Sequence, residues 1–116
     1  YDGNMLNAPQ IKRFKILSRE IKAKRWPMIF GALSDPTRFC IFEILCRSRD
    51  LCVTDIAQIC NLSIAAASHQ LKILEMVGLV ERIRHGKMIC YEVKTANPIV
   101  KAITKIFLEN KLEIRN

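Results

Sequence analysis

The side chains most capable of chemistry in this sequence are its cysteines. The 116 residues hold five of them, Cys40, Cys46, Cys52, Cys60 and Cys90. A zinc site needs about four thiolate, imidazole or carboxylate ligands, and ligands from one segment are usually closely spaced in pairs. The five cysteines have no paired spacing, which favours reduced thiols that mostly pack as small apolar side chains.

Two of these cysteines fall near the ends of predicted helices. A thiol that senses oxidants is exposed and has a lowered pKa. Cys52 and Cys60 are the candidates for such a sensor. The alternative is that both are buried packing residues.

A second chemistry, hydrogen bonding to nucleic acid, is offered by a run of small, polar and basic residues. Hydroxyl, imidazole and amide groups bond base edges or phosphates, an ammonium group neutralises a phosphate, and small residues let a backbone approach closely. In the first turns of the second helix of a helix-turn-helix, such residues reach the major groove. The candidate DNA contacts are Ser63, Ile64, Ala65, Ala66, Ser68, His69, Gln70 and Lys72.

Two short helices are predicted to position these residues. Apolar residues at helical spacing predict the first helix, with Thr54 as its N-cap and Asp55 in its first turn. A turn of about three residues leads to a second helix that Ser63 caps and Gly78 ends. Two short helices so tightly joined, here over 54–77, are the arrangement of a helix-turn-helix.

The period of the apolar residues changes after Gly78. Alternation through 79–94, interrupted by a turn at His85-Gly86-Lys87, predicts a β-hairpin with basic residues near its tip. Asn97-Pro98 then starts a helix with an apolar stripe over 98–114.

Three helices are predicted before the helix-turn-helix. A basic amphipathic helix covers 9–25 and a short helix covers 27–33. The segment Ser34-Asp35-Pro36 starts the third, with Asp35 as its N-cap, and this helix reaches about Cys46. A chain of this length is long enough for one domain with one core.

The charge balance points to a polyanionic partner. The formal net charge is +8. The excess is local, because residues 1–30 hold seven Lys and Arg against two Asp and Glu. Nucleic acid and anionic membranes are the usual partners of such a surface, and a solubilising face is the alternative.

Several segments together are more specific than any single motif. They are Ala32–Arg38, Asp50–Ala57, Leu62-Ser63, Ala67–Leu71, Leu74, Gly78-Leu79-Val80, Gly86-Lys87 and Tyr91. Over about 26–95 the sequence thereby resembles the ArsR/SmtB family of bacterial winged-helix repressors.

This resemblance implies a mainly α winged helix-turn-helix with a small β-hairpin. Such a protein would form a homodimer through its terminal helices, 9–25 and 98–114, and repress an operator in double-stranded DNA until a signal arrives. The stretch from Ser63 to Lys72 would read the major groove. On or near the wing, the cations that would reach phosphates or the minor groove are Arg82, Arg84 and Lys87. Both histidines, His69 and His85, would face DNA rather than a metal.

The sequence departs from the family at its metal sites. Metal sensors of the family often place two cysteines two apart in the segment that here reads Cys52-Val53-Thr54, so the second thiolate is missing. Other members use Asp and His of the last helix, and Asn97 to Asn116 contains no Asp, His or Cys. One isolated thiolate does not make a zinc site. We therefore expect neither inherited metal site, and no cofactor.

Other function classes have less support in the residues. There is no Gly-rich phosphate loop, nucleophile elbow or Cys-His pair in a recognisable setting, so an enzyme is not expected. A winged helix used for protein–protein contact, or a nonspecific nucleic-acid binder, is the alternative function. The basic helix over 9–25 could also lie on a membrane surface.

The predicted compartment follows from two segment types that the sequence lacks. No signal-peptide core lies between Tyr1 and Pro9, and no apolar run approaches the roughly 18 residues of a membrane span. The chain is therefore expected to be cytoplasmic, with no membrane partner.

Overall fold

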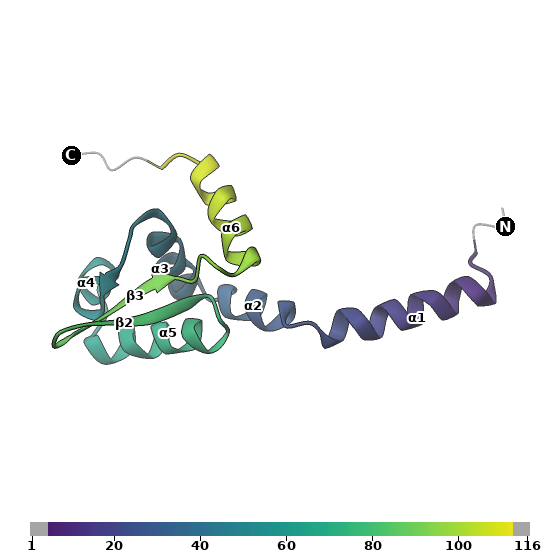
Figure 1. The fold of residues 1–116 in the computed structure, drawn as a ribbon, viewed down its shortest axis with the longest axis horizontal. Coiled ribbons are helices and arrows are strands. Elements are labelled where there is room, and N and C mark those ends of the chain that lie inside the picture. The colour runs from purple at the N-terminus through teal and green to yellow at the C-terminus, as the bar shows by residue number, and fades with distance from the viewer. Residues whose placement is uncertain (1–4, 113–116) are drawn as a thin grey trace.

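Helices alternate with a small sheet along the chain, which Figure 1 colours from purple at the N-terminus to yellow at the C-terminus. A computed structural model describes residues 5–112. Its elements are α1 (Ala8–Ala23), α2 (Trp26–Leu33), α3 (Pro36–Arg47), β1 (Leu51–Cys52), α4 (Val53–Ile59), α5 (Ile64–Met76), β2 (Val80–His85), β3 (Met88–Val93) and α6 (Pro98–Glu109). The order of helices, tight helix pair, hairpin and last helix is the predicted one.

Side-chain caps start three of the helices where the sequence predicts. Asp35, Ser63 and Asn97 each accept a hydrogen bond from a backbone N–H in the first turn of α3, α5 and α6 respectively. The prediction that Thr54 caps α4 is wrong, because α4 begins two residues earlier with Cys52 at the N-cap. There the Asp55 carboxylate accepts the Cys52 N–H at 2.9 Å, so Asp55 stabilises this helix start from its first turn, as expected.

A third strand joins the predicted hairpin. β2 and β3 pair antiparallel around a turn in which Gly86 has a φ of +63°, a conformation that favours glycine. β1 pairs with the other edge of β3, so that the strand order is β1-β3-β2. In this pairing Leu51 lies opposite Tyr91 and Cys52 lies opposite Cys90. A two-residue strand is too short to show alternation, so the sequence gives no periodic signal for β1.

The core lies between the central helices and one face of the sheet. Its largest fully buried side chains are Phe42, Ile41, Leu45, Ile56, Leu71, Leu74, Leu79, Val80 and Val100. On α5 the buried stripe consists of Ala67, Leu71 and Leu74. Burial of this stripe fixes the rotation of α5 and leaves its opposite side facing solvent.

The last helix packs on α3 and is shorter than predicted. The Phe107 ring meets two phenylalanine rings of α3 edge to face, with centroids 5.5 and 6.0 Å apart. Beyond it, the Arg47 guanidinium donates to the carbonyls of Phe107 and Asn110, at 2.6 and 2.7 Å, and so satisfies the C-terminal end of α6. The predicted span 98–114 is too long, because residues 110–112 are not helical and residues 113–114 lie outside the described range.

The first helix projects away from the rest of the chain (Figure 1). α1 has no buried residue, and its apolar side chains Phe14 and Ile21 are 56% and 54% exposed. The Cα radius of gyration is 19.1 Å, against about 13 Å for a compact chain of this length. The predicted amphipathic helix is therefore present, but its apolar side has no cover within the described chain.

Candidate nucleic-acid interface

A four-residue turn, 60–63, holds α4 and α5 in a fixed relation. Asn61 adopts the left-handed conformation with a φ of +54°, which asparagine tolerates better than most residues. The Leu62 N–H donates to the Ala57 carbonyl at 2.8 Å and closes the end of α4. Since α5 begins directly after the Ser63 cap, the two helices have the tight connection of a helix-turn-helix.

The solvent-facing side of α5 carries most of the predicted base contacts. Ala65, His69 and Lys72 are exposed, and Ser68 is half-buried beside them. Ile64 in the first turn keeps 59% of its surface exposed. Because the N-terminal end of a helix carries partial positive charge, this end of α5 also favours a phosphate.

A groove separates α4 and α5 from the wing, the hairpin formed by β2 and β3. Five of the predicted DNA contacts line it together, namely Ile64, Ser68, Lys72, Arg82 and Lys87. The residues that sequence reasoning did not assign to this groove are Val53, Thr54, Met88, Ile89 and Tyr91, and Cys52 also lines it. The helix face and the wing therefore form one continuous, basic surface.

Two other predicted contacts are engaged within the chain. The Gln70 amide oxygen accepts a hydrogen bond from the Arg38 guanidinium at 3.0 Å, so this side chain is directed toward α3. The Arg84 guanidinium donates to the Gly86 carbonyl at 3.0 Å across the wing turn, and it remains exposed. The structure does not bring Gln70 into the groove.

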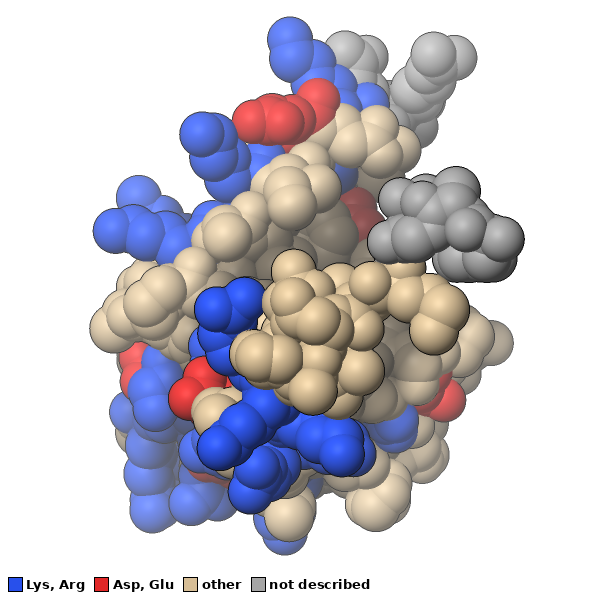
Figure 2. Space-filling model, turned by 90° about the vertical axis from the view of Figure 1, so that its right-hand side faces the viewer, with Lys and Arg blue, Asp and Glu red and all other residues tan. Residues whose placement is uncertain are grey.

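Positive charge also collects around the end of the molecule from which α1 projects. Figure 2 faces this end and shows Lys and Arg side chains gathered along its left and lower parts, with few acidic residues among them. The five cations of α1 itself are all exposed. This surface can attract a polyanion at long range.

The comparison with known proteins decides the family. The model of the arsR family of bacterial regulatory proteins matches residues 35–82. A cadmium resistance transcriptional regulatory protein CadC homolog of Staphylococcus aureus is 36% identical over 93 residues, which cover 77% of this chain and 76% of that protein.

The chain belongs to the arsR family of bacterial regulatory proteins. It is a DNA-binding regulator of transcription, as the groove and the relatives agree.

Two solved structures of similar proteins support the fold. Reduced HlyU from Vibrio cholerae superposes with a TM-score of 0.69 at 21% identity, covering 83% of this chain and 98% of that one. A homodimeric winged helix-turn-helix DNA-binding domain from Mycobacterium bovis superposes with a TM-score of 0.62 at 24% identity, covering 79% and 85%. The predicted fold class is thereby confirmed for this arsR-family chain. Among its described helices, none has the length and apolarity to span a bilayer.

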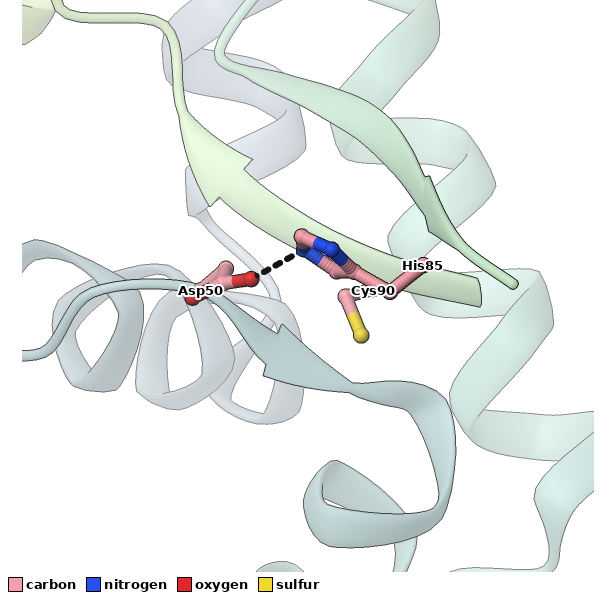
Figure 3. A group of neighbouring side chains, drawn as sticks. All are labelled: Asp50, His85 and Cys90. Atoms are coloured by element: carbon pink, nitrogen blue, oxygen red, sulfur yellow. Dashed lines mark hydrogen bonds and ion pairs between the residues drawn. The ribbon is translucent and has the colours of Figure 1, made fainter. Parts of the chain in front are cut away.

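The wing histidine of this arsR-family protein does not lie as predicted. His85 was expected to face DNA, but its Nε2 lies 2.6 Å from the Asp50 Oδ2 (Figure 3). This contact forms because β1 brings Asp50 beside the wing, a neighbour that the hairpin prediction lacked. Close by, burial and the adjacent Glu81 carboxyl raise the pKa of the Glu92 carboxyl.

The cysteines differ from the expectation of reduced thiols. Cys52 and Cys90 form a disulfide between β1 and β3, so that expectation is wrong for this pair. The other three are free thiols, with Cys40 exposed, Cys46 buried and Cys60 half-buried. Burial raises the pKa of the Cys60 thiol, and the neighbouring Cys40 adds to this, which disfavours the thiolate that a sensor needs.

Proposed function

We propose that this chain is a homodimeric transcriptional repressor that binds a palindromic operator through α5 and the wing. The observation that carries the proposal is the groove in which Ser68 and Lys72 of α5 face Arg82 and Lys87 of the wing. A B-DNA major groove admits a helix, and the flanking phosphates then lie within reach of basic side chains.

The residues divide into those that read bases and those that hold the backbone. Ser68 and His69 have groups that bond base edges, while Ile64, Ala65 and Ala66 allow close approach or contact a thymine methyl. The residues proposed to contact phosphates or the minor groove are Lys72, Arg82, Arg84 and Lys87, with the Ser63 end of α5 directed at the backbone. Gln70 can contact DNA only if its hydrogen bond to Arg38 opens.

The homodimer is proposed to form through the terminal helices. A 16-residue helix that buries nothing is marginal in water by itself. α6 also leaves apolar surface, because Ile106 is 63% exposed and Leu108 is 54% exposed. A second copy of the chain would cover both surfaces. The homodimeric state of the similar Mycobacterium bovis domain is consistent with this proposal.

The 116 residues then act as one DNA-binding unit whose function is binding, without a catalysed reaction. The proposed partner is operator DNA, so the proposed place of action is the bacterial cytoplasm. Two-fold symmetry would place the two α5 helices about one DNA turn (~34 Å) apart.

Replacing basic side chains of the groove tests whether the groove binds DNA. The variant Lys72→Ala/Arg82→Ala is compared with Lys94→Ala, which removes an exposed lysine outside the groove. Binding to a mixed pool of duplexes at low salt is measured by fluorescence anisotropy. We expect the double variant to bind at least about 100-fold more weakly than the native chain, because two phosphate contacts per protomer are lost, and Lys94→Ala to bind normally. Native-like binding by the double variant would show that the groove is not the interface, and no binding by the native chain would favour a protein-interaction role.

A further inference from the structure

The face of the sheet opposite the core brings four potential metal ligands together. Asp50 directly precedes β1 and contacts His85 of β2, and Cys52 is the second residue of β1. Successive residues of a strand point to opposite faces, so residues two apart share one face. Cys90 lies opposite Cys52 on one side and opposite Ile83 on the other, and His85 is two residues beyond Ile83. Asp50, Cys52, His85 and Cys90 therefore all belong to this face, and we call these four residues the wing-base cluster.

The ligand atoms of this cluster lie close to one another. The carboxylate of Asp50, the imidazole of His85 and the sulfur of Cys90 are all within 4.8 Å of one another. In Figure 3, Asp50, which directly precedes β1, faces His85 of β2, and Cys90 of β3 lies beside them. The Asp50 and His85 side chains are 34% and 54% exposed, whereas Cys90 is buried. A cation from solvent thus meets oxygen and nitrogen ligands first and sulfur beneath them.

The fourth ligand is the bonding partner of Cys90. The Cys52 sulfur is joined to the Cys90 sulfur, so reduction of the disulfide leaves two thiols side by side. Two thiolates, an imidazole and a carboxylate are the number and types of ligand that hold zinc tetrahedrally, with ligand atoms about 3.3–3.8 Å apart. Thiolate ligands select soft or borderline cations over Mg²⁺ and Ca²⁺.

The surroundings of the cluster are acidic, although the chain as a whole is basic. Glu81 and Glu92 are opposite each other on β2 and β3. Glu92 lines a shallow groove together with Asp50 and His85, in which Arg49 is the only cation among the lining residues that the structure describes. This local excess of carboxylates favours a divalent cation on an otherwise cationic protein.

We propose that the chain with Cys52 and Cys90 reduced binds one thiophilic divalent cation, of the Zn²⁺ or Cd²⁺ type, through the wing-base cluster. A dithiol reductant supplies two electrons and two protons, which convert the disulfide into two thiols while the reductant becomes its own disulfide. On binding, both thiols release a proton to solvent and their sulfurs bond the cation. The neutral His85 imidazole and the Asp50 carboxylate exchange their mutual hydrogen bond for bonds to the same cation. Disulfide and cation therefore exclude each other.

The wing-base cluster differs from the two family metal sites whose ligands this sequence lacks. Of its four residues, only Cys52 belongs to the segment in which metal sensors of the family place paired cysteines. Sequence reasoning missed the other three because β1, which places Asp50 and Cys52 beside the wing, has no periodic signal. The cluster also adjoins the groove, since Cys52 lines both.

The test is a metal titration of the full reduced chain without DNA, so its result does not depend on operator binding. Cd²⁺ is added under anaerobic conditions, and thiolate-to-metal charge-transfer absorption and calorimetry give the stoichiometry and affinity. The test variants are Cys52→Ser, Cys90→Ser and His85→Gln. Matched controls are the double variant Cys40→Ser/Cys60→Ser and the variant His69→Gln. Far-UV circular dichroism confirms that each variant folds, and His85→Gln changes an exposed side chain if burial makes the Cys90 variant unstable.

We expect one Cd²⁺ per reduced chain, competed by Zn²⁺, in the native protein and in both controls. Each cysteine variant should lose at least about 100-fold in affinity and His85→Gln at least about tenfold, because even outer contacts of metal sites contribute that much. The disulfide-bonded chain should show no charge-transfer band. The proposal is overturned if the reduced native chain binds no Cd²⁺, if the oxidised chain binds it equally well, or if the control cysteines rather than the cluster carry the absorption.

Discussion

Three basic side chains of each chain line the groove and should set how steeply DNA affinity falls with salt. They are Lys72, Arg82 and Lys87. Each phosphate that a cation neutralises contributes about 0.9 to the slope of log K against log salt. Arg84 does not line the groove and bonds the Gly86 carbonyl of the wing turn, so it is counted with the minor groove and not with the phosphate contacts. A homodimer with six phosphate contacts would have a slope of about −5.4, so its affinity would fall about 2000-fold between 50 and 200 mM salt.

Replacing Lys87 by alanine removes two of the six contacts in the dimer. The slope should then be about −3.6 and the loss of affinity over the same salt range about 150-fold. Fluorescence anisotropy with one duplex at four salt concentrations measures both values, and Lys94→Ala is the matched control. An unchanged slope for the Lys87 variant, or an equal change for the Lys94 variant, would refute the placement of the wing on the DNA backbone. A change in sequence preference without a change in slope would refute it as well.

Four further changes test separate parts of the structure. His69→Ala should alter the preferred bases at one or two positions of each half-site and leave the salt slope unchanged, as measured by selection from random duplexes; a uniform loss across sequences would contradict base reading. Phe107→Ala should lower the free energy of unfolding by about 3 kcal/mol, because it removes a ring packed on α3, and urea denaturation measures this; a loss under about 1 kcal/mol would contradict the packing of α6. Ser63→Ala should cost about 1 kcal/mol in the same assay through loss of the α5 cap, whereas Ser48→Ala, an exposed control, should cost little. Leu17→Glu on α1 should shift the protein from dimer to monomer in sedimentation equilibrium, and an unaffected dimer would exclude α1 from the interface.

Local signals made most of the fold predictable from the sequence. Asp35, Ser63 and Asn97 cap their helices through bonds to residues two or three positions away, so each start is encoded within a few residues. The buried stripe on α5 follows from helical spacing, and the hairpin follows from alternation around Gly86. Because these features depend on neighbours in sequence, the solvent-facing side of α5 could be deduced together with the buried side.

Contacts between distant segments explain what the sequence could not predict. β1 exists because its two residues pair with β3, almost 40 positions later, and this pairing alone unites Cys52 with Cys90. The end of α6 depends on Arg47, which is 60 residues before Phe107. Gln70 looks like a base contact by position, but Arg38 of α3 binds its amide. None of these long-range contacts produces a pattern of apolar residues at helical or strand spacing.

The central claim is that a dimer of this chain reads DNA with two α5 helices. The measurement that tests it most directly is selection of duplexes from a random library by the purified, reduced native chain. We predict enrichment of a two-fold palindrome with half-sites about 10 base pairs apart, centre to centre, or a multiple of that spacing. Enrichment of a single unpaired half-site, or binding with no enrichment of sequence, would contradict it.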